Sequence, residues 1–230
     1  MDIATLPGDP PVEIVLRRSA RSRRLSLRVS GTDGRVVLSY PARAPRAAVL
    51  AFAREREDWL RRALAGIPQA QQVEAGTALP FEGQPLRLVA APLRRARIEG
   101  GTLLVPPGRA GGPAAEAFLR AAARARLEPL CRDHAALLGR EPGRITLRDT
   151  RSRWGSCTAR GDLMFSWRLV LAPPEVLDYV AAHEVAHLVE LNHSARFWSL
   201  VEQLVPGWKG QRNWLRQKGA ALHRYRFRHD

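Results

Sequence analysis

Cysteine and long apolar runs are scarce in this sequence, and each shortage excludes a class of protein. Only Cys131 and Cys157 occur among 230 residues, too few for a disulfide framework or a zinc knuckle. No apolar run approaches the roughly 20 residues that span a bilayer, so we predict no membrane segment. The start of the chain has early acids and prolines and no apolar stretch typical of a secretory signal. We therefore expect a cytoplasmic protein.

Lysine and acidic residues are scarce too, whereas arginine is abundant. The formal charge is +15, and all but two of the 37 basic residues are arginine. Residues 1–110 carry 18 arginines against 10 acids, and residues 208–230 carry 7 basic residues against one acid. Residues 111–207 are nearly neutral, with 12 arginines against 11 acidic residues. The basic flanks suggest a DNA or other polyanion partner, although a compositional preference for arginine explains the charge equally simply.

The first 110 residues have the pattern of short strands with one helix. "VEIVLRRS", "RRLSLRVS" and "RVVLSYP" alternate apolar and polar residues, which predicts a three-strand antiparallel meander. A helical pattern follows from Ala44 to Gly66, then a linker over residues 66–77 and further short strands. The Gly-rich stretch 108–114 is the predicted boundary. These features predict a β-rich N-terminal domain over residues 1–110.

Residues 111–230 are mostly helical in pattern. We expect helices over 114–139, 174–191, 194–204 and 208–223, with short strands in "RITLRDT" and "RSRWGSCTARGDLMFSW". His223 and His229 fall in the basic tail, where solvated side chains are expected. The fold class predicted for the whole chain is α+β, with the second domain over residues 111–230.

The stretch "HEVAHLVELNH" carries the clearest chemical signal. On a helix, His187 lies about 40° round from His183, so both imidazoles point the same way and one metal ion bridges them. Glu184 is offset by about 100°, beside the metal without ligating it. Two histidine ligands with an adjacent carboxylate are what a metal-assisted hydrolase needs. A solvated surface helix with coincidental spacing is the plain alternative.

A catalytic zinc site needs a third protein ligand. His193 is too far along a continuous helix, so the chain must turn near Asn192, and Ser194 is suited to begin the next helix as its N-cap. The sequence "ELNHS" therefore has the chemistry to bring His193 to the metal. Glu202 is a rival third ligand, because some zinc hydrolases take a glutamate from a following helix.

Several stretches together resemble the YgjP-like metallopeptidases, relatives of the SprT and Spartan zinc proteases. They are "RDTRSRWGSC", "HEVAHLVELNHSARFW" and "PGWKGQRNWL", and the similarity extends over about residues 12–225. The resemblance implies a zincin-like C-terminal metallopeptidase domain behind a smaller β-rich N-terminal domain. It also implies His183, His187 and His193 as Zn2+ ligands and Glu184 as the catalytic base.

Three further residues are candidates for substrate binding. In zincin-like folds an edge strand beside the active helix binds extended substrate, and "RSRWGSC" would supply it, with Arg151 or Arg153 holding a carboxyl or an oxyanion. Tyr179 lies one turn before His183 and would hydrogen-bond in the site. The alternative is structural, with arginines covering acidic surface and Tyr179 in the core.

We therefore predict a zinc metallopeptidase that hydrolyses peptide bonds of a protein or peptide substrate, in which Glu184 takes a proton from a metal-activated water. Two other functions remain open at the level of sequence. One is zinc-dependent hydrolysis of a nucleotide or other phosphorylated substrate, with arginines holding phosphate. The other is a nucleic-acid-binding module whose metal site is structural.

Overall fold

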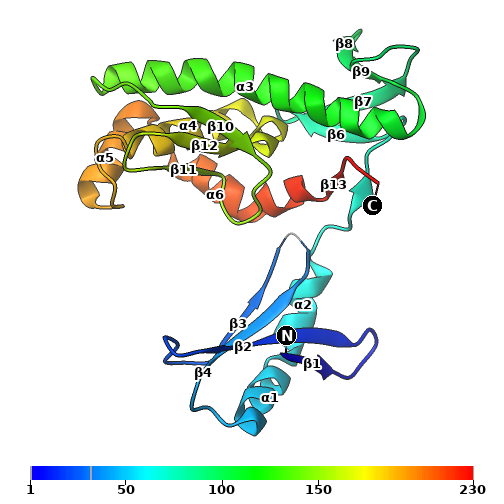
Figure 1. The fold of residues 1–230 in the computed structure, drawn as a ribbon, viewed down its shortest axis with the longest axis vertical. Helices are drawn as coiled ribbons and strands as arrows, with labels where there is room; N and C mark the ends of the chain where they lie inside the picture. The colour runs from blue at the N-terminus through cyan, green and yellow to red at the C-terminus, as the bar shows by residue number, and fades with distance from the viewer. Residues whose placement is uncertain (1, 32, 230) are drawn as a thin grey trace. The chain divides into compact units, whose positions relative to one another are not determined.

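The computed structural model describes residues 2–31 and 33–229 and has a mixed α+β fold, as predicted. The chain divides into two compact units, residues 1–69 and residues 70–230. Both are drawn in Figure 1, and each is described by itself below. Within the described residues, no helix has the length and apolar character needed to cross a membrane.

The smaller unit is a four-stranded sheet packed against two helices. Its strands follow the order β1-β2-β4-β3. The elements are β1 (Asp2–Leu6), β2 (Val12–Ser19), β3 (Ser26–Val29), β4 (Val36–Pro41), α1 (Arg46–Glu55) and α2 (Glu57–Ala65). The apolar positions of β2 and β4 face the helices and are buried against them, with Ile14, Leu38, Val49 and Leu60 at most 1% exposed.

The predicted antiparallel meander is wrong in one respect. Strands β2 and β4 are neighbours and run parallel, while β3 pairs antiparallel with the outer side of β4. The connection after β2 is "ARSRR", which lacks a two-residue turn signal, so β3 does not fold back on β2. Strand β4 takes the central place because Val36 and Leu38 fill the buried face beside Ile14.

The larger unit contains the remaining strands and four longer helices. The strands are β5 (Gln71–Gln72), β6 (Ala78–Phe81), β7 (Gln84–Ala90), β8 (Arg97–Glu99), β9 (Thr102–Val105), β10 (Ile145–Arg148), β11 (Gly155–Cys157), β12 (Leu163–Ser166) and β13 (Tyr225–Arg226). The helices are α3 (Gly111–Leu137), α4 (Pro174–Ala186), α5 (Ala195–Leu204) and α6 (Lys209–Lys218), with 3-10 turns η1 (Gly108–Ala110), η2 (Trp167–Leu171) and η3 (Gly219–His223).

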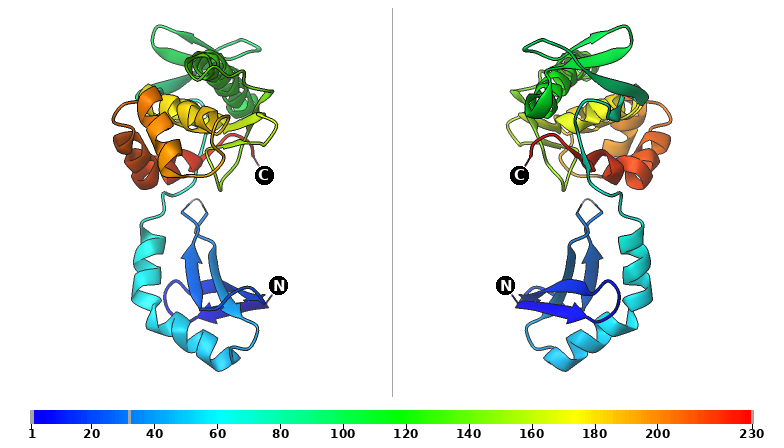
Figure 2. Two further views of the ribbon diagram at one scale, coloured as in Figure 1. Left: turned by 90° about the vertical axis from the view of Figure 1, so that its left-hand side faces the viewer. Right: turned by 90° about the vertical axis from the view of Figure 1, so that its right-hand side faces the viewer.

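Helix α3 is the longest element of this unit and joins two hydrophobic cores. Its first half packs on the sheet β6-β7-β9-β8 and on η2, where Leu88, Leu103, Leu119 and Trp167 are fully buried. Its second half packs on α4, α5 and β12, where Phe165, Val185 and Phe197 are fully buried. Figure 1 shows α3 running past both groups of elements, and the views of Figure 2 look nearly along this helix. The helix thus supports the element that carries the histidine motif.

The units divide between residues 69 and 70, whereas the predicted domain boundary lies after residue 110. The predicted linker over 66–77 spans the observed division. Residues 70–110 belong with the larger unit because β6–β9 form one core with the first half of α3. In addition, β5 pairs in parallel with β13, which joins Gln71 to Tyr225. The Gly-rich stretch 108–114 is therefore the start of a helix inside a unit.

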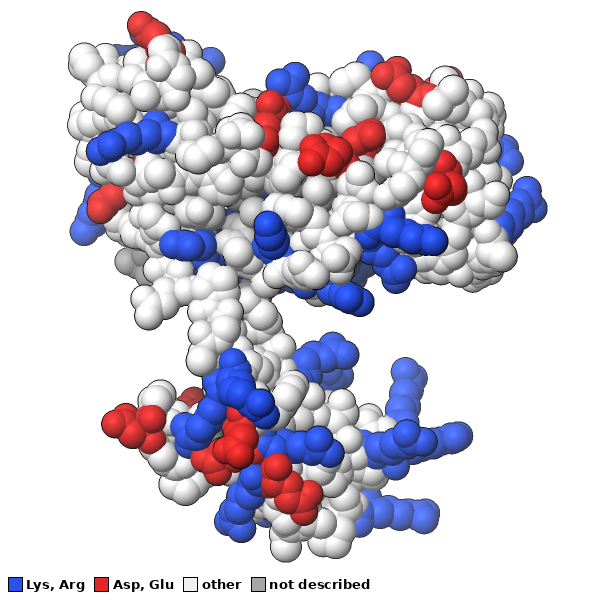
Figure 3. All heavy atoms as spheres, turned by 180° about the vertical axis from the view of Figure 1, so that it is seen from behind, with Lys and Arg blue, Asp and Glu red and all other residues white. Residues whose placement is uncertain are grey.

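Arginine side chains are prominent on the smaller unit. Figure 3 shows blue side chains projecting from it, many of them with no red carboxylate beside them. Residues 1–69 hold 13 arginines against 7 acidic residues. Six of these arginines lie within residues 17–28, around the connection between β2 and β3. A polyanion partner for this surface stays a prediction.

Candidate active site

Helix α4 and the turn after it carry the histidine motif. Pro174 occupies the first helical turn, as the prolines predicted, and α4 extends to Ala186. The chain then turns over residues 187–190 through short-range backbone hydrogen bonds, earlier than the predicted end near residue 191. Ser194 begins α5 as its N-cap, and its side-chain oxygen accepts a hydrogen bond from the amide of Phe197, as predicted. This tight connection returns His193 toward α4.

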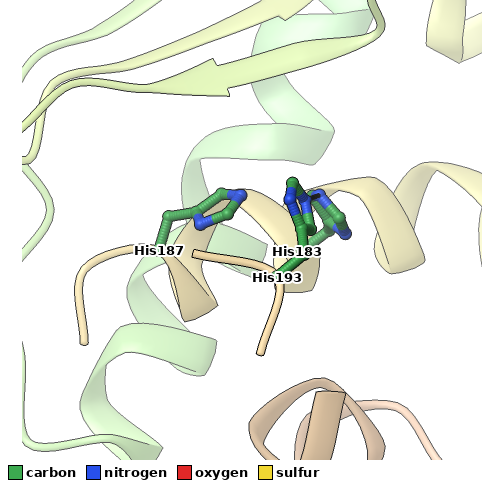
Figure 4. Close-up of side chains that lie close together, drawn as sticks. All are labelled: His183, His187 and His193. Carbon is green, nitrogen blue, oxygen red and sulfur yellow. Dashed lines mark hydrogen bonds between the residues drawn. The ribbon is translucent and has the colours of Figure 1, made fainter. Parts of the chain in front are cut away.

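The turn brings the three histidines together. The candidate ligand atoms of His183, His187 and His193 all lie within 4.8 Å of one another. His183 and His193 face each other with their Nε2 atoms 3.1 Å apart. Figure 4 shows these two rings side by side, with a ring nitrogen of His187 directed toward them. Among the described residues, these three histidines form a group that could hold a metal ion.

The donor set fits a zinc-sized ion. Two nitrogens bound to one tetrahedral zinc at ~2.0–2.1 Å lie about 3.3 Å apart, close to the Nε2 separation of 3.1 Å between His183 and His193. The Nδ1 atom of His187 lies 3.0 Å from the carbonyl oxygen of Glu190. Because a carbonyl only accepts, Nδ1 carries the proton and Nε2 is left with the lone pair that a metal needs. The Nδ1 atom of His183 is buried and has no hydrogen-bond partner among the described residues, so no hydrogen bond orients this ring as the Glu190 carbonyl orients His187.

The ring of Phe197 packs against all three imidazoles. Its ring centroid lies 4.9, 4.4 and 4.8 Å from those of His183, His187 and His193. The side chain is fully buried. Phe197 follows His193 by four residues, so the first turn of α5 places it directly beneath the turn that delivers the third histidine.

Glu184 is held close to the backbone of strand β11. Its side chain is buried, with 5% of the residue exposed. A Cβ atom added to Gly155 would lie 2.5 Å from both Cγ and Oε1 of Glu184. Such distances are far inside van der Waals contact, so glycine is needed here for strand and helix to approach.

Burial sets the protonation of the site. Burial, the neighbouring histidines and Arg212 lower the pKa of His183 to about 3. Burial also lowers the pKa of His187, although its hydrogen bond to the Glu190 carbonyl opposes this. Both rings are therefore neutral near pH 7, the form that binds metals. Burial raises the pKa of Glu184 to about 8, against the opposing effect of Arg153.

A cavity of about 350 Å³ opens beside His183 and Glu184. Arg153 and Tyr179, both predicted to bind substrate, line it, whereas Arg151 is not among its lining residues. The cavity walls also include Trp154, Gly155, Val180, Arg212, Leu215 and Arg216. Tyr179 stacks on Trp208 and its ring meets His183 edge-on. Burial raises the pKa of Tyr179 to about 12, so its hydroxyl is a hydrogen-bond donor at neutral pH.

The alternative third ligand raised by the sequence has another place in the structure. Glu202 accepts a hydrogen bond from the amide of Gly207 and is not part of the histidine group. Cys157 is half-buried, and burial raises the pKa of its thiol to about 11, so it is a neutral thiol. His223, expected to be solvated, is 5% exposed and packs on Trp154; that expectation is wrong because η3 folds into the core of the unit.

A family model described as "YgjP-like, metallopeptidase domain" matches residues 23–218. The chain belongs to the YgjP-like metallopeptidase family. It is also similar to one solved structure, the crystal structure of the metallopeptidase zymogen of Pyrococcus abyssi abylysin. That similarity has 24% identity and a TM-score of 0.37, and it covers 40% of this chain and 93% of the other. No curated protein matches the chain.

Membership of this family makes the YgjP-like chain a metallopeptidase, a hydrolase whose substrates are proteins or peptides. It also implies a metal ion, and the histidine cluster on α4 and the turn after it offers nitrogen ligands for one. The family model extends over parts of both compact units, so the match is not confined to the histidine motif.

Proposed function

We propose that this protein is a zinc-dependent endopeptidase, with His183, His187 and His193 as the ligands and Glu184 as the general base. The observation that carries the proposal is the convergence of three imidazoles, whose candidate ligand atoms lie within 4.8 Å of one another, beside the buried carboxylate of Glu184 on α4. Three protein ligands leave one coordination position for water or substrate, as in catalytic rather than structural zinc sites. The elements α3–α6 and β10–β12 would then form a zincin-like catalytic domain.

A zinc ion bound here would supply Lewis acidity, lowering the pKa of a water molecule and polarising the substrate carbonyl. The charge of the ion also favours the ionised form of Glu184, against the burial that raises the pKa of this carboxyl to about 8. Glu184 accepts a proton from the water as its oxygen bonds to the carbonyl carbon. It then gives that proton to the nitrogen of the leaving amine as the C–N bond breaks.

Substrate is proposed to bind along strand β11. This strand lies at one edge of the three-stranded sheet, whose order is β10-β12-β11. A peptide that adds to this edge would run past Gly155 and the carboxylate of Glu184. Arg153 and Tyr179 line the same cavity and can donate hydrogen bonds to the substrate or to the developing oxyanion. Arg151 lies just before this segment and remains a candidate for the same role.

The decisive experiment combines metal analysis with a peptidase assay on the variant Glu184→Gln. Wild-type protein should contain about one zinc per chain by mass spectrometry and hydrolyse an unfolded protein substrate. Glu184→Gln should keep its zinc, because this carboxylate is not a ligand, and lose about 10²–10⁴-fold in activity. Full activity in Glu184→Gln would exclude Glu184 as the base.

Glu202→Gln is the matched control. It removes the same functional group from α5, where the carboxylate accepts a hydrogen bond from Gly207. This variant should retain both zinc and activity. Loss of zinc in Glu202→Gln with zinc retained in His193→Ala would instead make Glu202 the third ligand and overturn the ligand set.

A further inference from the structure

Three arginines converge on the cavity beside Glu184 from two different elements. Arg153 precedes β11, and Arg212 and Arg216 lie one turn apart on α6. The cavity is about 350 Å³, near the lower end of the roughly 300–1,000 Å³ typical of ligand sites. It has room for one or two side chains of an extended substrate. Three positive charges are more than the proposed hydrolysis step uses.

These arginines have no carboxylate partner of their own. Among the described residues, none of the three lies within 4.0 Å of an acidic oxygen. By contrast, all four arginines of the long helix α3 are ion-paired: Arg120 with Glu116, Arg124 and Arg132 with Glu128, and Arg126 with Glu82. Glu184 is the acidic residue in the cavity wall, and it is buried in the floor. The mouth of the cavity is therefore strongly positive.

Aromatic rings fix the position of Arg212. Its guanidinium lies 4.9 Å from the ring centroid of Trp198 and 5.7 Å from that of Trp208. These two indoles are themselves stacked at 4.3 Å. A guanidinium that interacts with aromatic rings in this way can still use its N–H groups to bind a ligand. The charge of Arg212 is near enough to contribute to the lowered pKa of His183, after burial and the other two histidines.

We propose that this cavity is a specificity pocket for a carboxylate of the peptide substrate, on a residue next to the cleaved bond. The proposal rests on the peptidase function proposed above and names the substrate class of that site. Trp154, Val180 and Leu215 give the pocket apolar walls for the methylene groups of a side chain, while the arginines at the mouth bind the carboxylate. A substrate lysine at this position is repelled. The carboxylate comes from an aspartate or glutamate side chain or from a free C-terminus.

The first test uses the zinc-loaded full chain and peptides blocked at both ends. A blocked, randomised peptide mixture is digested, and the cleavage sites are read by mass spectrometry. Matched quenched peptides then carry Glu, Gln or Lys at the selected position. We expect kcat/KM to be about 10–100-fold higher for Glu than for Gln, the range of a charge-assisted contact, and lower still for Lys. A pair with free and amidated C-termini measures the terminal carboxylate in the same way.

Variants of the arginines test the pocket itself. Arg212→Gln and Arg216→Gln should each reduce the preference for Glu over Gln several-fold, and Arg212→Glu should shift it toward Lys. Lys218→Gln removes a positive charge from the same helix outside the pocket and should leave the preference unchanged. Equal loss of activity toward all three peptides would contradict the proposal, because it would indicate a general role for the arginines.

A binding measurement separates this proposal from the proposed function. Labelled Glu and Gln peptides are titrated with Glu184→Gln protein, and fluorescence anisotropy gives the two affinities without turnover. Tighter binding of the Glu peptide with no hydrolysis by wild type would keep the pocket and reject the peptidase function. Hydrolysis with no preference among Glu, Gln and Lys would reject the pocket alone. Hydrolysis of a nucleoside triphosphate with no peptide binding would overturn both.

Discussion

The larger unit contains two clusters of ionisable side chains, one around Arg168 and one formed by the three histidines, and they differ in whether their polar groups have partners. Arg168 is 6% exposed and donates to both oxygens of Asp149 and to the carbonyls of Leu222 and Tyr225. The three histidines instead direct ring nitrogens at one another, although two of those nitrogens lie only 3.1 Å apart. The polar groups of the first cluster are paired within the protein, whereas the nitrogens of the second are arranged as a group that could hold a metal ion.

A lowered histidine pKa does not distinguish the two clusters. Burial is the main cause at both, lowering the pKa of His183 to about 3 and that of His223, near Arg168, to about 4. The two histidines differ in their surroundings. His223 packs on Trp154 near the Arg168–Asp149 ion pair, whereas His183 faces two further imidazoles. Convergence of unshared lone pairs is thus the better indicator of a metal site.

The largest effect is expected from His193→Ala. Removing one of three ligands should weaken zinc binding more than the ~10–100-fold that follows loss of an outer hydrogen-bond partner, and hydrolysis should be lost with the metal. His193 is exposed, so the metal-free fold should unfold at nearly the same urea concentration as metal-free wild type. Mass spectrometry and urea titration measure the two effects; unchanged zinc content would refute the proposed ligand set.

The opposite pattern is expected from Arg168→Leu. This change leaves Asp149 and two carbonyl oxygens without their donor, and it removes a guanidinium that lies 4.7 Å from the Trp167 ring centroid. We expect a loss of about 3 kcal/mol in the free energy of unfolding. Tryptophan fluorescence follows the larger unit, because Trp59 alone of the six tryptophans lies in residues 1–69. Zinc bound per folded chain should be unchanged, and loss of zinc from the folded protein would argue against separate clusters.

Gly155→Ala should produce an intermediate effect confined to catalysis. The added methyl group forces the Glu184 carboxylate away from its position against β11. Displacement of a catalytic group by about 1 Å costs on the order of 10²-fold in rate, and zinc should remain bound. Gly210→Ala is the control, since a Cβ there meets nothing within 4 Å. Equal activity of the two variants would show that Gly155 does not position Glu184.

Low pH should lower the free energy of unfolding through His223, which lies near Arg168. The pKa of His223 is about 4 in the folded chain and ~6.5 in the unfolded chain, so between these values only the unfolded chain takes up the proton. The free energy of unfolding should therefore fall as pH decreases from about 6.5 to 4, by about 2 kcal/mol at pH 5. His223→Gln removes this titration, and urea unfolding at pH 7 and pH 5 should show a smaller loss. An identical loss in both proteins would assign the effect to other groups.

The sequence was most informative where the interactions are local. The spacing of His183 and His187, the turn before His193 and the cap at Ser194 all depend on residues within about one helical turn of each other. These features place the three rings together without knowledge of the rest of the fold. The α+β class also followed from the periodicity of the segments.

The remaining features depend on contacts between distant parts of the chain. Gly155 touches Glu184 across 29 residues of sequence, and Arg212 reaches the cavity from α6; neither has a local pattern that reveals its neighbour. The same reason explains why β2 and β4 were not expected to pair in parallel and why His223 was expected to be solvated. Alternation identifies a strand or a buried face but not the partner that covers it.

The pairing of β5 with β13 also has a consequence for the order of events during synthesis. Residues 225–227 close the core that surrounds Trp167, and every residue of the candidate site precedes them in the chain. A ribosome therefore makes all the proposed ligands and the proposed base before it makes the segment that completes their support. The larger unit should mature only after residue 227 has emerged, so hydrolytic activity should appear late, when the nascent chain no longer presents an incomplete unit to its own peptidase.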